Sequence, residues 1–277
     1  MGLRINTNVA SLSAQRSLNN VTEAKNSNLE KLSSGERINK AADDAAGLAI
    51  SEKMKAQIRG SQQADRNAND AISLIQVAEG ASNEVSNILV RLRELSVQAA
   101  SDTVGDTERA FSDKEYQNLV QEVDRIAQST SFNGKTLING EGEKVDFQIG
   151  TYNDDQNDRL SYDVASANLT TSALGIDGSG VASKEASQAN LDSIDKALDT
   201  VNGNRANFGA LQNRLQATSR NLQIKTDNLS AANSRIRDTD IAQVSAEMTK
   251  NNILSQSGTS VLAQANSAGQ SALRLIG

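Results

Sequence analysis

The sequence predicts a mainly α-helical protein, in which long antiparallel helices form a coiled-coil-like rod with one β-hairpin. The 277 residues include no proline, a residue that costs about 3 kcal/mol inside a helix. Apolar residues recur at heptad spacing in both halves of the chain, as they do in coiled coils. Aromatic residues make up only 3% of the chain, which argues against the core of a β-sandwich or barrel of this size.

The first forty residues contain few large apolar side chains. The large aliphatic residues among them are Leu3, Ile5, Val9, Leu12, Leu18, Val21, Leu29, Leu32 and Ile38. So little apolar area does not offset the entropy lost when forty residues become ordered. At the other end, Val261 begins a seam made largely of alanine, which also buries little area. We therefore expect both ends of the chain to need partners in order to fold.

A long helix is predicted before residue 100, because apolar residues step by three and four without interruption. These residues are Ala71, Leu74, Ala78, Ala81, Val85, Ile88, Leu92, Leu95 and Ala99. Gly105 follows the expected end of this helix, and Ser112 with Glu115 predicts a capping box at the start of the next one. The sequence Phe-Asn-Gly at residues 132–134 is expected to end that second helix.

The late part of the chain predicts a second long helix with a strict seven-residue repeat. Its repeated residues are Ile194, Val201, Phe208, Leu215, Leu222, Leu229 and Ile236. A straight helix drifts by about 20° per heptad against such a repeat, so the pattern indicates left-handed supercoiling. Several companion positions are polar, including Arg205, Gln212 and Ser219. This favours packing against several helices over a two-stranded zipper.

Between the long helices, apolar and polar residues alternate at positions 145–149 and again at 160–164. This pattern predicts a β-hairpin near residues 143–165. The acidic segment 153–158 that joins the two strands lacks the glycine and the bidentate glutamate of a calcium-binding loop. We therefore expect a solvated turn there.

The composition excludes several classes of function. Without histidine or cysteine, the chain has no imidazole base, thiolate nucleophile or zinc–thiolate cluster. Nothing distinguishes a pair among its 34 acidic residues as a general acid and base, so we expect no enzyme, no catalytic or metal site and no cofactor. A net charge of -6 without a dense basic run argues against a nucleic-acid partner. No window approaches the roughly 20 apolar residues of a membrane span, and the N-terminus is no ordinary secretory signal.

Long motifs near both ends closely resemble those of bacterial flagellins. The N-terminal motifs are LSSGERINKAADDAAGLAISEKM at residues 32–54, QIRG at 57–60, RLRELSVQAA at 91–100 and FNGKTLING at 132–140. The C-terminal motifs are SRIRDTDIAQVSAEMTKNNIL at 234–254 and QANSAGQSALRLIG at 264–277. Glu36 departs from the apolar residue often found at its position in the family. The large variable outer domains of longer flagellins are missing, so the chain is similar to a minimal form.

The resemblance implies a domain organisation and a structural role. Residues 1–43 and 239–277 would form an axial domain that is disordered in the monomer and pairs as a helical coiled coil on polymerisation. Residues 44–238 would form a rod-like helical domain with the hairpin. The chain would polymerise with copies of itself into the open helical filament of the flagellum, for motility. It would be secreted, exported unfolded by the flagellar type III apparatus, which needs no ordinary signal peptide.

Two groups of residues are expected to hold such a polymer together. The candidates for filament assembly are Leu3, Ile5, Val9, Leu12, Val261, Leu273, Leu275 and Ile276. The candidates for packing of the rod domain are Val85, Ile88, Leu92, Phe208, Leu215, Leu222 and Leu229.

The resemblance also implies other partners. Arg91, Leu95 and Glu115 match the positions engaged by the Toll-like receptor that senses flagellin, and Gln98 lies one helical turn beyond Leu95. Residues 273–276 resemble the tail bound by the flagellar export chaperone and by cytosolic immune sensors. Hook-associated and cap proteins would be further partners of the filament.

Two alternative functions stay open at this point. A hook–filament junction protein shares the paired terminal segments, and an intracellular coiled-coil scaffold would explain the heptads but not the sparse termini. The sequence also leaves open whether the filament is naked, sheathed or periplasmic.

Overall fold

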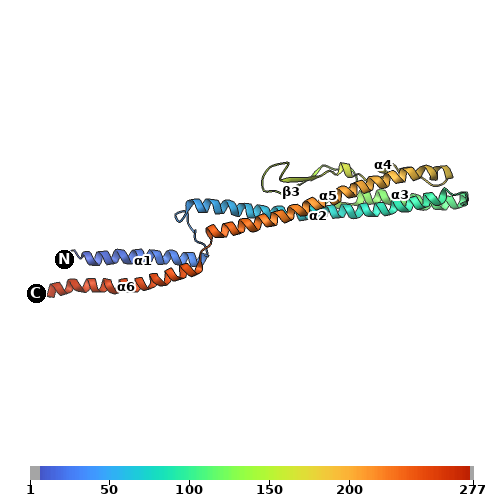
Figure 1. The fold of residues 1–277 in the computed structure, drawn as a ribbon. Coiled ribbons are helices and arrows are strands. Elements are labelled where there is room, and N and C mark those ends of the chain that lie inside the picture. Colours follow the sequence, from blue (N-terminus) through green and yellow to red (C-terminus); the bar gives the residue numbers. More distant parts are fainter. Residues whose placement is uncertain (1–6, 275–277) are drawn as a thin grey trace. The chain divides into compact units, whose positions relative to one another are not determined.

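The structure is a computed structural model that describes residues 7–274, with side chains described as far as residue 267. Its helices are α1 (Val9–Ser34), α2 (Ala45–Ala99), α3 (Asp106–Ser129), α4 (Thr171–Leu174), α5 (Lys184–Arg237) and α6 (Ile241–Arg274), with a short 3₁₀ helix η1 at Ala165–Ala167 (Figure 1). Two antiparallel strand pairs join β1 (Ser131–Phe132) to β2 (Lys135–Thr136), and β3 (Val145–Gln148) to β4 (Arg159–Tyr162). The mainly α-helical fold class with a hairpin is confirmed.

The chain divides into two compact units. The terminal unit consists of Met1–Ala56 and Asn228–Gly277, and the central unit is Gln57–Asp227. Both divisions fall inside long helices, α2 and α5. The domain boundaries expected at residues 43/44 and 238/239 lie instead in the loops that flank these helices, and they stay a prediction.

The buried face of α2 in the central unit follows a regular row of small and branched residues. Each of its members is at most 2% exposed: Ser61, Ala64, Ala68, Ala71, Ile75, Ala78, Ser82, Val85, Leu89, Leu92, Ser96 and Ala99. The expected row shares Ala71, Ala78, Val85, Leu92 and Ala99 with this face. Its other members flank the face, and two of them, Ala81 and Ile88, are only partly buried.

Buried serines explain why the buried row of α2 differs from the predicted row. The Ser82 hydroxyl donates a hydrogen bond to the Ala78 carbonyl at 2.7 Å, and the Ser96 hydroxyl donates to the Leu92 carbonyl at 2.9 Å. Because each hydroxyl is satisfied by its own helix, its burial costs little. The spacing of apolar residues alone therefore does not predict burial at these positions.

Helix α5 presents its heptad residues to the same core. Ile194, Val201, Phe208, Leu215 and Leu222 are each at most 6% exposed. The Phe208 ring packs against Tyr162 of β4, with 5.7 Å between the ring centroids. The next two heptad residues, Leu229 and Ile236, lie in the terminal unit and are only partly buried.

The start of α3 differs from the prediction. The helix begins at Asp106 after Gly105, so Ser112 and Glu115 lie inside it and form no capping box. Asp106 and Glu108 in the first turn favour this start, because carboxylates stabilise the positive end of a helix. Arg109 is buried and donates hydrogen bonds to the Ala99 and Ser101 carbonyls at 2.8 and 2.9 Å, which ties the end of α2 to α3.

The expected β-hairpin is present. Strands β3 and β4 pair antiparallel, with Val145 opposite Tyr162 and Phe147 opposite Leu160. In the loop between them, the Asp154 carboxylate accepts hydrogen bonds from the Gln156 and Asn157 backbone amides and from the Asn157 side chain, which keeps the turn closed by its own polar groups. Asn133 and Gly134 both have positive φ, at 50° and 78°, and form the two-residue turn between β1 and β2. The sequence predicts only the end of a helix at this position, and not the strand pair that the turn joins.

We predict that Leu92→Ala lowers the free energy of unfolding by about 2–5 kcal/mol, because it leaves a cavity at a fully buried leucine. Val90 lies on the same helix but is 47% exposed, so Val90→Ala should cost about 0.5 kcal/mol or less. Urea unfolding followed by circular dichroism measures both changes. Equal losses in the two variants would contradict this orientation of α2.

We also predict a loss of stability in alkali. Burial raises the pKa of the Tyr162 hydroxyl above its ordinary value of 10.0, and the nearby Asp163 carboxylate raises it further. The folded state therefore disfavours the phenolate. This stabilising contribution is complete below about pH 10 and is lost as the pH rises through the folded-state pKa.

Tyr162→Phe should make the free energy of unfolding less dependent on pH above about 10. It should also lower stability at neutral pH, because the Leu137 carbonyl loses the hydroxyl that donates to it at 2.5 Å. Urea titrations at a series of pH values measure both effects. An unchanged alkaline slope would exclude Tyr162 as a source of the pH dependence.

Candidate assembly interface

Helices α1 and α6 of the terminal unit lie side by side and antiparallel (Figure 1). The Asn8 side-chain amide donates to the Ala265 carbonyl at 2.8 Å, and the Ser11 hydroxyl donates to Asn266 Oδ1 at 2.7 Å. Further along, Leu18 lies so close to Gly258 that a Cβ there would be 3.2 Å from Leu18 Cδ1. A single residue-by-residue register therefore holds along the pair.

This helix pair buries few side chains. In α1 only Asn28 is buried, and among residues 241–267 of α6 only Val244 is. Large apolar side chains of the terminal unit are instead 41–60% exposed: Val9, Leu12, Leu29, Ile50, Ile241, Ile253, Leu254 and Val261. The pair thus carries apolar area that its own chain does not cover.

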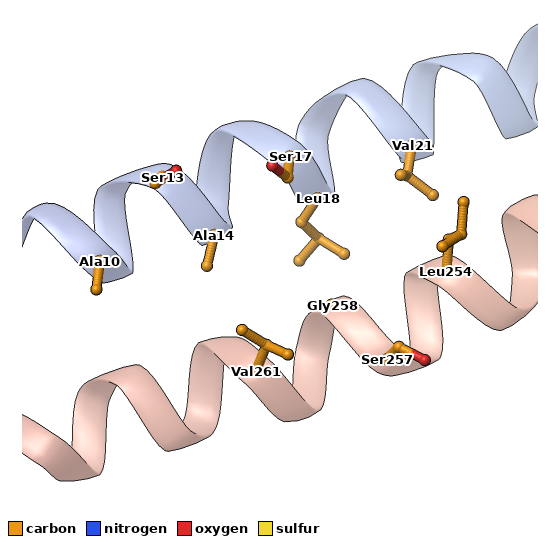
Figure 2. A pocket seen from close by; sticks show the side chains of 10 residues that line it. All are labelled: Ala10, Ser13, Ala14, Ser17, Leu18, Val21, Leu254, Ser257, Gly258 and Val261. Carbon is orange, nitrogen blue, oxygen red and sulfur yellow. The ribbon is translucent and has the colours of Figure 1, made fainter.

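A groove of about 510 Å³ runs between the two helices. Figure 2 shows that Leu18 and Val21 of α1 and Leu254 and Val261 of α6 point into the space between the helices. The other lining residues are small, namely Ala10, Ser13, Ala14, Ser17, Ser257 and Gly258. Apolar walls with small side chains between them favour close approach by another apolar helix face.

The residues expected to assemble a filament fall partly in this region. Val9, Leu12 and Val261 are 60%, 50% and 57% exposed, and Val261 lines the groove. Leu3, Ile5, Leu275 and Ile276 lie outside the described residues, as does the side chain of Leu273. Leu18, Val21 and Leu254 also line the groove but are not among the predicted assembly residues. Leu18 and Val21 belong to the few large aliphatic residues of the first forty positions.

The residues expected to pack the rod domain lie in two environments. Val85, Leu92, Phe208, Leu215 and Leu222 are buried in the central unit. Ile88 is partly buried and packs against that core. Leu229 is partly buried and belongs to the terminal unit.

The residues expected to contact an immune receptor differ in how exposed their side chains are. Arg91 lies between two carboxylates, with Nη2 at 2.7 Å from Glu115 Oε1 and Nη1 at 3.0 Å from Glu94 Oε2. Arg91, Glu115 and Gln98 are exposed. Leu95 is 2% exposed and lies in the core one turn beyond Arg91. The structure thus brings Arg91 and Glu115 together on the surface and places Leu95 beneath it.

Other kinds of site are not found in the part of the chain that the structure describes. Within it, no three His, Cys, Asp or Glu residues are arranged to hold a metal ion. None of its helices has both the length and the apolar character needed to cross a lipid bilayer.

Comparison with known proteins gives matches at both ends of the chain. Residues 5–143 match the model of the bacterial flagellin N-terminal helical region, and residues 191–276 match that of the bacterial flagellin C-terminal helical region. The chain is 42% identical to a flagellin of Halalkalibacterium halodurans, over 98% of this chain and 99% of that protein. It is 43% identical to the flagellar filament 33 kDa core protein of Treponema phagedenis, again over 98% and 99%. A crystal structure of Bacillus cereus flagellin aligns with a TM-score of 0.51 and 31% identity, covering 61% of this chain and 94% of that one.

Proposed function

The chain belongs to the bacterial flagellin family, and we propose on this basis that it is a structural subunit of the flagellar filament rather than an enzyme. The observation that carries the proposal is the uncovered apolar area of the α1–α6 pair. Further copies of the same pair would cover it. Contacts between unlike faces of identical subunits generate an open helical polymer when the rotation that relates neighbouring subunits does not close into a ring.

We further propose that residues 1–43 and 239–277 form the axial domain of this filament and fold only on assembly. The contrast in burial supports this, since the central unit has a continuous core whereas α1 buries only one side chain. Folding coupled to association also keeps free subunits from polymerising at random. Residues 44–238 would form the rod.

Secretion and the remaining partners rest on the resemblance of the motifs. We propose export in an unfolded state through the flagellar type III apparatus, with residues 273–276 as the chaperone-binding tail. The filament would lie outside the cell body and end at hook-associated and cap proteins. The same tail would be the ligand of cytosolic immune sensors.

A receptor surface on α2 and α3 is a separate proposal. Arg91, Gln98 and Glu115 would contact the Toll-like receptor for flagellin, since all three are exposed. Leu95 would act from below, because its burial holds the turn that carries Arg91 and Gln98 against the core.

The two alternatives are less well supported. A hook–filament junction protein shares the paired ends, but identities of 42–43% over nearly the whole length join this chain to a flagellin and a filament core protein. An intracellular scaffold would not require uncovered apolar helix faces at both ends of the chain.

We predict that deleting residues 1–20 or 258–277 leaves a soluble helical monomer that forms no filaments. A point variant tests the same surface, since Val261→Asp places a charge on an apolar position of the groove and should abolish assembly. Val261→Leu keeps the position apolar and should still assemble. Sedimentation and electron microscopy measure filaments, and circular dichroism checks the monomers. Filaments from either truncation would show that the terminal helices are dispensable.

We predict that Arg91→Ala weakens receptor signalling by roughly tenfold or more, because arginine contacts at interface centres are worth more than about 1.4 kcal/mol. Arg125 offers a matched control, being an exposed arginine of α3 that pairs with Glu122 at 2.6 Å. Arg125→Ala should leave signalling unchanged in the same reporter assay with monomeric protein. Equal potency of the two variants would remove Arg91 from the receptor surface.

A further inference from the structure

The joint where α1 leads into α2 and α5 leads into α6 is held by backbone hydrogen bonds. Gly35 ends α1 in the left-handed conformation, with φ 72°. The Thr239 amide donates to the Gly35 carbonyl at 2.9 Å, and the Arg37 amide donates to the Arg237 carbonyl at 2.6 Å. These two bonds form an antiparallel bridge in which Glu36 lies opposite Asp238. Segments some 200 positions apart in sequence are thereby joined at one point.

A single arginine occupies the centre of this joint. The Arg237 side chain is 14% exposed, and its Nε lies 2.9 Å from Glu36 Oε2. This nitrogen is buried without a well-aligned hydrogen-bond acceptor, so the contact of Nε with Glu36 is an ion pair and not an aligned hydrogen bond. Its Nη1 pairs with the Glu52 carboxylate of α2. One guanidinium therefore links the loop after α1, the first turns of α2 and the end of α5.

A second arginine supports the same end of α5. The Arg37 guanidinium donates from Nη2 to the Ile236 carbonyl at 2.7 Å. Cations at a helix C-terminus are favoured, because the last carbonyls have no partners in the helix and carry partial negative charge. Ile38 beside it is 2% exposed. The joint thus has the buried and bonded contacts that most of α1 and α6 lack.

The α1–α6 pair needs such a reference point. Beyond the hydrogen bonds of Asn8 and Ser11 at the end far from the joint, the groove is lined mostly by small residues. A smooth seam of small residues specifies helix register weakly. Polar and charged groups at one place in a helical interface are the better-attested means of fixing register.

We propose that Arg237, with Glu36 and Glu52, is a clamp that closes this joint as the axial segments fold and sets the register in which α1 and α6 pair during assembly. The inference rests on the proposed filament function and adds positioning residues to it. The clamp should matter more than an exposed pair such as Lys40–Glu30, whose side chains are 64% and 43% exposed, because water screens exposed pairs strongly.

The first experiment measures elongation of sheared filament fragments by purified subunits. Glu36→Gln and Arg237→Gln should each raise the critical concentration by about tenfold, and the double variant should be no worse than the poorer single one, because the two residues act as a unit. Arg237→Lys keeps the charge but lacks the planar fork that reaches two carboxylates, so it should fall in between. Glu30→Gln removes an exposed pair of the same unit and should match the wild type.

A second experiment measures the register directly. The chain has no cysteine, so Ser11→Cys with Asn266→Cys introduces a single pair at positions whose side chains are in contact. The disulfide should form in high yield in filaments that carry only this cysteine pair, and in clearly lower yield when Glu36→Gln is added.

The outcomes separate the clamp from the filament function. If wild-type subunits elongate fragments while Glu36→Gln matches Glu30→Gln both in elongation and in disulfide yield, the clamp is refuted and the filament function stands. If wild-type subunits do not elongate at all, the filament function fails instead.

Discussion

The low burial in the terminal unit has a simple physical cause: two paired helices can cover only part of each other's side-chain surface. A helix in a pair covers one stripe of its surface and leaves the rest to solvent or to other partners. In α1 and α6 the exposed apolar side chains outside the groove include Val9, Leu12 and Ile253. In the central unit, α2 instead meets α3, α5 and the hairpin, and its row from Ser61 to Ala99 is almost fully buried. The central unit thus has a buried core of its own, whereas the terminal unit leaves apolar side chains exposed. Such a subunit is suited to polymerise through its terminal unit.

The central unit achieves its burial with unusually small side chains. Alanine and serine alternate with branched residues along α2, so neighbouring helices can approach closely along a narrow seam. Larger side chains fill the core beneath the hairpin, where Tyr162 of β4 packs against Phe208 of α5. A low aromatic content is thus compatible with a continuous core, provided that the helices are long and the core is thin.

The sequence predicted the features that depend on apolar periodicity and missed those that depend on polar groups. The heptads of α5 from Ile194 to Leu222 and the hairpin could be predicted, because burial repeats with the period of the backbone. The burial of Ser82 and Ser96 on α2 could not be predicted, since it depends on hydroxyls that bond within their own helix. The start of α3 depends on the carboxylates of Asp106 and Glu108 in its first turn. The joint depends on Arg237, whose partners Glu36 and Glu52 are far away in sequence, so no local pattern reveals it.

The surface around Arg91 would connect the proposed assembly with the proposed receptor recognition. Val90 and Val97 lie on α2 next to Arg91 and Gln98, and they are 47% and 51% exposed. Because exposed apolar side chains one heptad apart form a stripe along one side of a helix, these two valines are suited to contact with a neighbouring subunit of the proposed filament. Such a contact would cover the adjacent charged residues as well. A receptor that reads Arg91 and Glu115 would then detect free subunits, whose surface is open, in preference to the polymer.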